Sequence, residues 1–194
     1  MSHPRRSHPL TREELVAAAL GIVDSEGLAA LTMRRLAEVL GVEAMSLYHH
    51  VANKDVLLDW TVDRVRSEMR LDNLPENLPE NWIEILEAIF VELRRVLAAH
   101  PNMLPIATRK TGASASGLTF LMETGFGRDE AVDIYQSLVA FTIGYALLSS
   151  YGPTSDWPAL PADLNERMRD WRDETFRRGL RSIMEGLGSK QGVG

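Results

Sequence analysis

The chain has 194 residues, of which 45% are hydrophobic and 25% charged, so it can build the core of one large or two small domains and is not a disordered tail. It contains no cysteine, which excludes a disulfide framework and a thiolate metal site, and no run of 18 consecutive apolar residues, so we expect a soluble cytoplasmic protein. The net charge of −6 looks wrong for a nucleic-acid-binding protein, but residues 1–54 carry six Lys or Arg and six Asp or Glu, so the acidic excess lies outside them.

Residues 1–9 are expected to form an arm ahead of the first helix. They include two prolines and the pair Arg5 and Arg6, which is typical of a flexible arm that enters a minor groove. A solvated terminal tail explains the same residues equally well. Thr11 and Glu14 then have the spacing of a capping box, and apolar residues continue at the helical period to Gly27. This pattern predicts a first helix that supports the elements after it.

Residues 32–54 predict a helix, a tight turn, a short second helix and the start of a further one. Thr32 can cap the first of these helices, Leu36, Val39 and Leu40 share one helical face, and Gly41 supplies the positive φ that ends it. The short helix leaves polar, aromatic and small side chains outside the core, namely Ala44, Met45, Ser46, Tyr48 and His50. Packing explains such a helix poorly, whereas the reading helix of a helix-turn-helix explains it well.

The stretch LTMRRLAEVLGVEAMSLYHHVANKDVLLD resembles the DNA-binding head of the tetracycline-repressor (TetR) family. The resemblance lies in the threonine that opens the helix, the L-A-x-x-L-G-V turn, the L-Y-x-H-V reading helix and the N-K pair after it. It implies a base or phosphate contact for Arg34, base-edge positions for Ala44, Met45 and Ser46, and backbone contacts for Tyr48, His50 and Lys54.

Two of these residues have a plainer interpretation. Arg34 can be one more surface arginine, and His50 can be half buried against the following helix. The tetracycline repressor itself has glutamine, proline and threonine where this chain has Ala44, Met45 and Ser46, so a different operator is expected. Ala44 and Met45 suit thymine methyl groups, and Ser46 bonds to several bases. Sequence choice then depends also on Arg34, the arm and DNA shape.

Asn53 is expected to cap the next helix and to place Lys54 in its first turn, where backbone N–H groups already favour a phosphate. The apolar stripe of this helix continues to Met69, so we expect the helix to transmit movement between domains. Residues 72–81 contain LPEN twice and predict a hinge. The expected organisation is therefore an arm (1–9), a DNA-binding domain (10–71), a hinge (72–81) and a C-terminal domain (82–194).

The remainder is helical by pattern, so the predicted fold class is all-α. We expect a helix from Trp82 that stops at Pro101, a loop over residues 111–117, a brief helix to Glu123, a long helix over 129–150, and a last helical stretch over 163–187. The segments TGFGRDEAVDIYQSLVAFTIGYAL and TFRRGLRSIMEGL resemble the last helices of the TetR-type C-terminal domain, which pair across a two-fold axis as a four-helix bundle. This resemblance implies a homodimer, with an interface that includes Leu138, Phe176, Leu180, Ile183, Met184 and Leu187.

The resemblance also implies a pocket for a small effector in the C-terminal domain. Its candidate lining is mostly apolar and consists of Ile85, Ile89, Met103, Leu104, Thr108, Met122, Tyr135, Phe141 and Tyr145. A plain hydrophobic core explains any one of these residues as well or better. The two histidines that help the tetracycline repressor bind its metal–drug complex are replaced by Arg70 and Pro105, so a magnesium–tetracycline inducer is not expected. The five histidines have no zinc-site spacing, and we expect no metal or cofactor.

An enzyme is not expected, because the chain has no G-x-S-x-G elbow and no phosphate-cradling glycine loop. An alternative is an all-helical protein-interaction module that retains the head shape without its DNA function. We predict a DNA-binding transcriptional regulator, a repressor that binds a palindromic operator as a homodimer and is released by a small, largely apolar effector.

Overall fold

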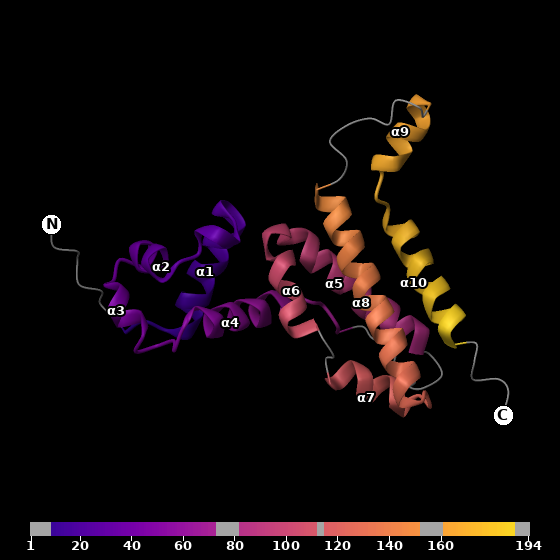
Figure 1. The fold of residues 1–194 in the computed structure, drawn as a ribbon, viewed down its shortest axis with the longest axis horizontal. Helices are drawn as coiled ribbons and strands as arrows, with labels where there is room; N and C mark the ends of the chain where they lie inside the picture. The colour runs from indigo at the N-terminus through magenta and orange to yellow at the C-terminus, as the bar shows by residue number, and fades with distance from the viewer. Residues whose placement is uncertain (1–8, 73–81, 112–114, 152–160, 189–194) are drawn as a thin grey trace. The chain divides into compact units, whose positions relative to one another are not determined.

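The computed structural model describes residues 9–72, 82–111, 115–151 and 161–188. Every regular element in these ranges is a helix, which confirms the all-α prediction (Figure 1). The chain forms two compact units, one made of residues 1–68 and 102–109 and the other of residues 69–101 and 110–194. We call them the head and the body and describe each by itself.

The head contains α1 (Arg12–Glu26), a short 3-10 turn (Leu28–Ala30), α2 (Met33–Leu40), α3 (Ala44–Leu47) and α4 (Lys54–Arg66). Three of these helices begin at the predicted caps. The Thr11 hydroxyl accepts from the Glu14 amide as part of a full capping box, the Thr32 hydroxyl accepts from Arg35 N, and Asn53 Oδ1 accepts from Val56 N at 2.9 Å. These side chains satisfy amides that a helix start leaves without intrahelical partners.

The turn between α2 and α3 is set by Gly41, which has a φ of 66° and ends α2 as predicted. The buried face of α2 differs from the prediction, because Ala37 is buried with Leu36 while Val39 is 47% exposed. The reason is that α2 packs against both α1 and α3, so these two neighbours together determine which residues are covered. Leu47 is fully buried and fixes α3 to the head.

The head also contains a segment far along the chain. Residues 102–109 belong to this unit and include part of a 3-10 turn (Pro101–Met103) and the start of α6 (Leu104–Thr111). The domain boundaries expected from the sequence had assigned these residues to the C-terminal domain. The Asn102 side-chain amide donates to the carbonyl oxygens of Val23 at 3.0 Å and Asp24 at 3.2 Å, near the C-terminal end of α1.

The body contains α5 (Trp82–Ala99), α7 (Ala115–Glu123), α8 (Arg128–Tyr151), α9 (Ala162–Arg169) and α10 (Asp173–Gly188). The long helix α8 packs against α5, α7 and α10, and α10 also packs against α5 (Figure 1). Two predictions were wrong in detail. The loop predicted over 111–117 is already helical from Ala115, and the last stretch is two helices because Asp170, with φ −88° and ψ 88°, leaves the helical region. Most of the predicted hinge lies outside the described residues.

Candidate nucleic-acid interface

The side chains predicted to contact DNA lie at the surface of the head. Arg34 on α2 has 89% of its side chain exposed, and on α3 Met45 is 73% exposed. Tyr48 and His50 are also exposed, so the alternative of a half-buried His50 is not what the structure has. Ala44, Ser46 and Lys54 are half-buried. Exposure permits contact with DNA, and the individual roles stay predictions. Arg5 and Arg6 lie outside the described residues.

Helix α3 is short, and local bonds hold it in place. The Ser46 hydroxyl donates to the carbonyl oxygen of Glu43 at 2.6 Å, and Val51 N donates to the carbonyl oxygen of Leu47 at 3.0 Å. Leu47 is fully buried, so the opposite side of the helix, which carries Met45, faces away from the core. The exposed Met45 side chain is therefore available to thymine methyl groups.

Lys54 is the first residue of α4, which Asn53 caps. The unpaired amides of a first helical turn and the helix dipole favour an anion, and the lysine adds a full positive charge there. This end of α4 is therefore suited to a phosphate of the DNA backbone.

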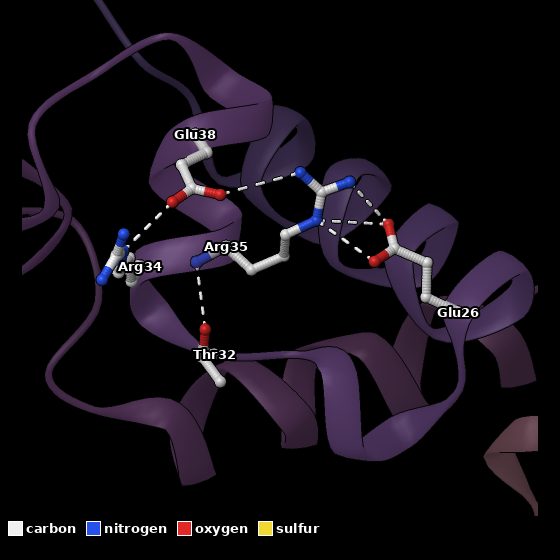
Figure 2. A network of polar contacts seen from close by, with 5 residues as sticks. All are labelled: Glu26, Thr32, Arg34, Arg35 and Glu38. Carbon is white, nitrogen blue, oxygen red and sulfur yellow. Dashed lines mark hydrogen bonds and ion pairs between the residues drawn. The ribbon is translucent and has the colours of Figure 1, made fainter.

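A chain of opposite charges runs across α2 (Figure 2). Glu26 holds Arg35, with Nη2 to Oε1 at 2.7 Å and Nε at 3.2 Å from both carboxylate oxygens. These hydrogen bonds hold the pKa of the Glu26 carboxyl below its ordinary value and raise the pKa of Arg35. Glu38 accepts from Arg34 Nε at 3.1 Å, and its other oxygen lies 3.8 Å from Arg35 Nη1. Arg35 is thus committed to Glu26, whereas Arg34 keeps most of its guanidinium in solvent.

An open hollow of about 290 Å³ lies at the junction of α2 and α3. It is lined by Arg34, Ala37, Glu38, Gly41, Val42 and Ala44. Glu38 was missed by the sequence reasoning. Its only signal there is the four-residue spacing from Arg34, which is common on helix surfaces.

The structure shows how far one chain alone covers the predicted dimer residues, and the interface itself stays a prediction. Leu138, Phe176, Leu180 and Met184 are fully buried within one chain, where α5, α8 and α10 pack together. These four side chains belong to the core of the body, because a side chain without exposed surface cannot contact a partner. Ile183 and Leu187 are half-buried, and Leu147 and Leu148 on α8 are 44% and 52% exposed.

The predicted effector residues are not brought together in one unit, since Met103, Leu104 and Thr108 belong to the head and the others to the body. Met103, Leu104, Ile85, Tyr135 and Tyr145 are buried, Ile89 and Phe141 are half-buried, and Met122 is 40% exposed. The Thr108 side chain lies outside the described part of the structure. The predicted pocket therefore stays a prediction.

Tyr145 and Phe141 lie in an aromatic cluster that also contains Phe176 and Trp171. The Arg94 guanidinium lies 5.5 Å from the Tyr145 ring centroid and 5.0 Å from that of Phe176, and it pairs with Asp173. Burial lowers the pKa of Arg94 and raises the pKa of Tyr145, whose hydroxyl donates to the carbonyl oxygen of Arg172. Sequence reasoning did not place Arg94 in this aromatic cluster, because the cluster is formed by residues from three distant segments of the chain.

Charged residues also gather along α10. Glu87, a buried carboxylate on α5, is contacted by Arg177 at 3.0 Å and by Arg181. An open hollow of about 560 Å³ beside them is lined by these residues and by Glu174, Arg178, Ser182 and Glu185. Among the described residues, no group of three or more His, Cys, Asp or Glu could hold a metal ion.

Comparison with known proteins matches both parts of the chain. Residues 15–59 match the family described as bacterial regulatory proteins, tetR family, and residues 74–156 match the tetracyclin repressor-like C-terminal domain. The class C tetracycline repressor protein of Escherichia coli is 30% identical over 200 residues, which span 92% of this chain and 90% of that protein. An HTH-type transcriptional regulator of Saccharopolyspora erythraea is 29% identical over 214 residues, which span 97% of this chain and 89% of that one. The crystal structure of the Streptomyces coelicolor TetR family protein ActR in complex with actinorhodin has 31% sequence identity and a TM-score of 0.74, and the match covers 96% of this chain and 100% of that one.

Proposed function

Because the chain belongs to the tetR family of bacterial regulatory proteins, we propose that it binds a palindromic DNA operator as a homodimer and represses transcription until a small, largely apolar effector releases it. The observation that carries this proposal is the surface of α2 and α3. There Arg34, Met45 and Tyr48 are exposed, while the buried Leu47 fixes the reading helix to the head. As a regulator of bacterial genes, it would act in the cytoplasm.

On DNA, the two copies of α3 would enter successive major grooves about 34–36 Å apart. Arg34 donates to a base or phosphate, Ala44 and Met45 contact thymine methyl groups, and Ser46 bonds to a base edge. Tyr48, His50 and Lys54 bind the phosphate backbone, which fixes the register. Arg5 and Arg6 of the arm would reach the adjacent minor groove.

The homodimer is supported by the incomplete burial of α8. This helix has 24 residues and is apolar enough by length and composition to cross a membrane, but only 39% of its most apolar window is buried in the described structure. A second copy would cover this surface, including Leu147 and Leu148, and an isologous interface lets the same face serve on both copies. The mixed charges of α10, with Arg177, Arg178, Glu174 and Glu185, allow pairing across a two-fold axis.

Release by an effector requires a connection between body and head. Residues 102–109 provide one, because they belong to the head by packing and continue directly from α5 of the body by sequence. The effector would bind in the body against residues such as Ile85, Ile89, Tyr135, Phe141 and Tyr145, and favour a state in which the two heads no longer match the operator. Such coupling is reciprocal, so operator DNA must weaken effector binding by the same factor. The related protein ActR has been crystallised in complex with actinorhodin.

The proposal is tested by selecting genomic DNA fragments with the purified full-length protein and measuring the best fragment at several salt concentrations. An enriched palindrome bound with a Kd of about 10⁻⁸ M or tighter, and with a steep salt dependence, is the expected result. Failure to enrich any fragment, together with salt-independent weak binding, would favour the all-helical protein-interaction module.

A further inference from the structure

We propose that Glu38 is a specificity-determining residue of the DNA interface, because it positions the Arg34 guanidinium to read a guanine. This inference rests on the proposed function of the head as a DNA reader. Glu38 is four residues after Arg34 on α2, and both side chains line the hollow between α2 and α3.

The bond between the two residues leaves a defined part of the guanidinium available. Glu38 Oε1 accepts from Arg34 Nε at 3.1 Å, so one donor on the side of the guanidinium is engaged. Within the described ranges, the hydrogen bond of the Arg34 side chain is made by Nε and not by the terminal Nη1 or Nη2 atoms. Because arginine carries its five N–H groups in one plane, these two atoms form a fork at the end of the side chain. A fork of this kind donates to O6 and N7 of guanine in the major groove.

Glu38 is itself held in place from the other side (Figure 2). Its second oxygen lies 3.8 Å from Arg35 Nη1, and Arg35 is bound through two nitrogens to Glu26 on α1. The order Glu26, Arg35, Glu38, Arg34 thus places opposite charges side by side across the helix. This network keeps Arg35 bound to Glu26 and away from DNA. Glu38 in turn fixes the orientation of the Arg34 guanidinium.

The hollow gives a base edge room beside the fork. The other side chains that line it are small, namely those of Ala37, Val42 and Ala44, and Gly41 has none. In the uncomplexed protein the ion pair is exposed and contributes little, since water screens it. When DNA covers this surface and displaces water, the same pair becomes stronger, and the orientation of Arg34 is fixed where the base is read.

Glu38 also places a negative charge next to the phosphate backbone. That charge weakens binding to every DNA sequence, whereas the oriented Arg34 strengthens binding only where a guanine lies opposite. On random DNA only the repulsion acts, whereas on the operator the oriented Arg34 opposes it. This difference separates a positioning role from simple repulsion.

The test measures binding of the full-length protein to its selected operator, to operators with each guanine replaced in turn, and to random DNA, all at one salt concentration. For Glu38→Met, which removes both the charge and the oxygen acceptor, we expect tighter binding to random DNA. The ratio of operator affinity to random-DNA affinity, here called the margin, should fall by about five- to tenfold or more, as for the loss of one bidentate base contact. The variant should also become indifferent to the guanine replacement that most weakens the wild type. Glu38→Asp, which retains the carboxylate, should recover part of the margin.

Glu13→Met is the matched control, since it makes the same change in the exposed first turn of α1. It should leave the margin unchanged. In the double variant of Arg34→Ala and Glu38→Met, the margin should fall no further than with Arg34→Ala alone, because Glu38 acts through Arg34. A circular-dichroism melt of each variant verifies that the head is folded.

Two results would overturn the inference. An equal gain on operator and random DNA for Glu38→Met would mean that Glu38 only repels, and unchanged binding to both would mean that it has no part in recognition. A wild-type protein without any preferred fragment would overturn the proposed function itself, and this inference with it.

Discussion

The side-chain amide of Asn102 donates to the carbonyl oxygen of Val23 at 3.0 Å, which ties a segment that follows the body helix α5 to the C-terminal end of α1 in the head. It also donates to the carbonyl oxygen of Asp24 at 3.2 Å. The Val23 carbonyl oxygen also accepts from the Gly27 amide at 2.9 Å, so the Asn102 side chain adds a second donor at the end of α1. The bond stabilises the head and joins it to the segment that arrives from the body.

Replacement of Asn102 by alanine should therefore lower the free energy of unfolding by about 0.5–1.5 kcal/mol, the usual contribution of one such hydrogen bond. Hydrogen exchange should become faster in the last turn of α1, where the Gly27 amide bonds to the carbonyl oxygen of Val23. Urea unfolding and amide exchange measure the two effects. Ser25→Ala is the control, because it removes a bond that stays within α1, from Ser25 Oγ to the Gly21 carbonyl oxygen. Equal exchange rates in both variants would show that Asn102 does not hold the helix end.

The pair of Glu26 and Arg35 predicts how the head responds to acid. The hydrogen bond from Arg35 holds the pKa of Glu26 below its ordinary value of 4.5, so the folded state favours the ionised carboxylate. The stabilisation is therefore present above pH 4.5 and is lost as the pH falls through the folded-state pKa. Arg35→Ala should return the Glu26 pKa to its ordinary value, which a carboxyl NMR titration measures directly. It should also reduce the thermal stability of the head at pH 7, with a difference that disappears in strong acid. A Glu26 pKa that does not change on loss of Arg35 would contradict this account.

Gly179 on α10 should not tolerate a side chain. A Cβ atom at this position would collide with the ring of Phe141 on α8, and that ring is stacked on Phe176 with an interplanar angle of 6° and cannot easily yield. Gly179→Ala should destabilise the body by about 1–3 kcal/mol, the usual cost of overpacking a core. Gly186→Ala is the control on the same helix, because a Cβ there meets no atom within 4 Å. The control should be neutral or stabilising, since alanine favours a helix more than glycine does. Thermal unfolding of the two variants compares them, and equal melting temperatures would contradict the predicted collision.

The exposed residues of α8 provide the test of the dimer. Leu147→Glu combined with Leu148→Glu should yield a folded monomer, because charges would then be buried without partners in the proposed interface. Sedimentation velocity measures the oligomeric state, and circular dichroism verifies the helix content. Met122→Glu is the control, since this residue is also apolar and 40% exposed but lies on α7. Leu180→Glu is expected to unfold the body instead, because Leu180 is fully buried within one chain. A double variant of α8 that remains dimeric would place the interface elsewhere.

Local signals in the sequence predicted the helix starts correctly. Thr11, Thr32 and Asn53 cap helices in the structure because capping depends on residues three positions apart. The apolar stripe of α10 was also recognised, but its pattern indicates only that a face is covered. It does not say whether the cover is the same chain or a partner, which is why Leu180 was assigned to the dimer interface and is found in the core. The contact of Asn102 with Val23 joins residues 79 positions apart and leaves no local pattern. The fold and the outward-facing residues of α3 were thus predictable, whereas the contacts between distant segments were not.

Lys54 and Ser46 should differ in what their loss does to DNA binding. Lys54 lies at the N-terminal end of α4, where a phosphate is favoured regardless of sequence, so Lys54→Ala should weaken binding to all DNA about equally. It should also reduce the slope of log affinity against log salt concentration by about 1, since one fewer counterion is released.

Ser46 lies in α3, and Ser46→Ala should leave the salt slope unchanged and alter the preferred sequence instead. Its hydroxyl already bonds to the Glu43 carbonyl oxygen, so a base must be reached through the remaining lone pairs or by rotation of the hydroxyl. Titrations of operator and random DNA at several salt concentrations distinguish the two roles. Equal losses on both kinds of DNA for Ser46→Ala would mean that Ser46 supports α3 and does not read a base.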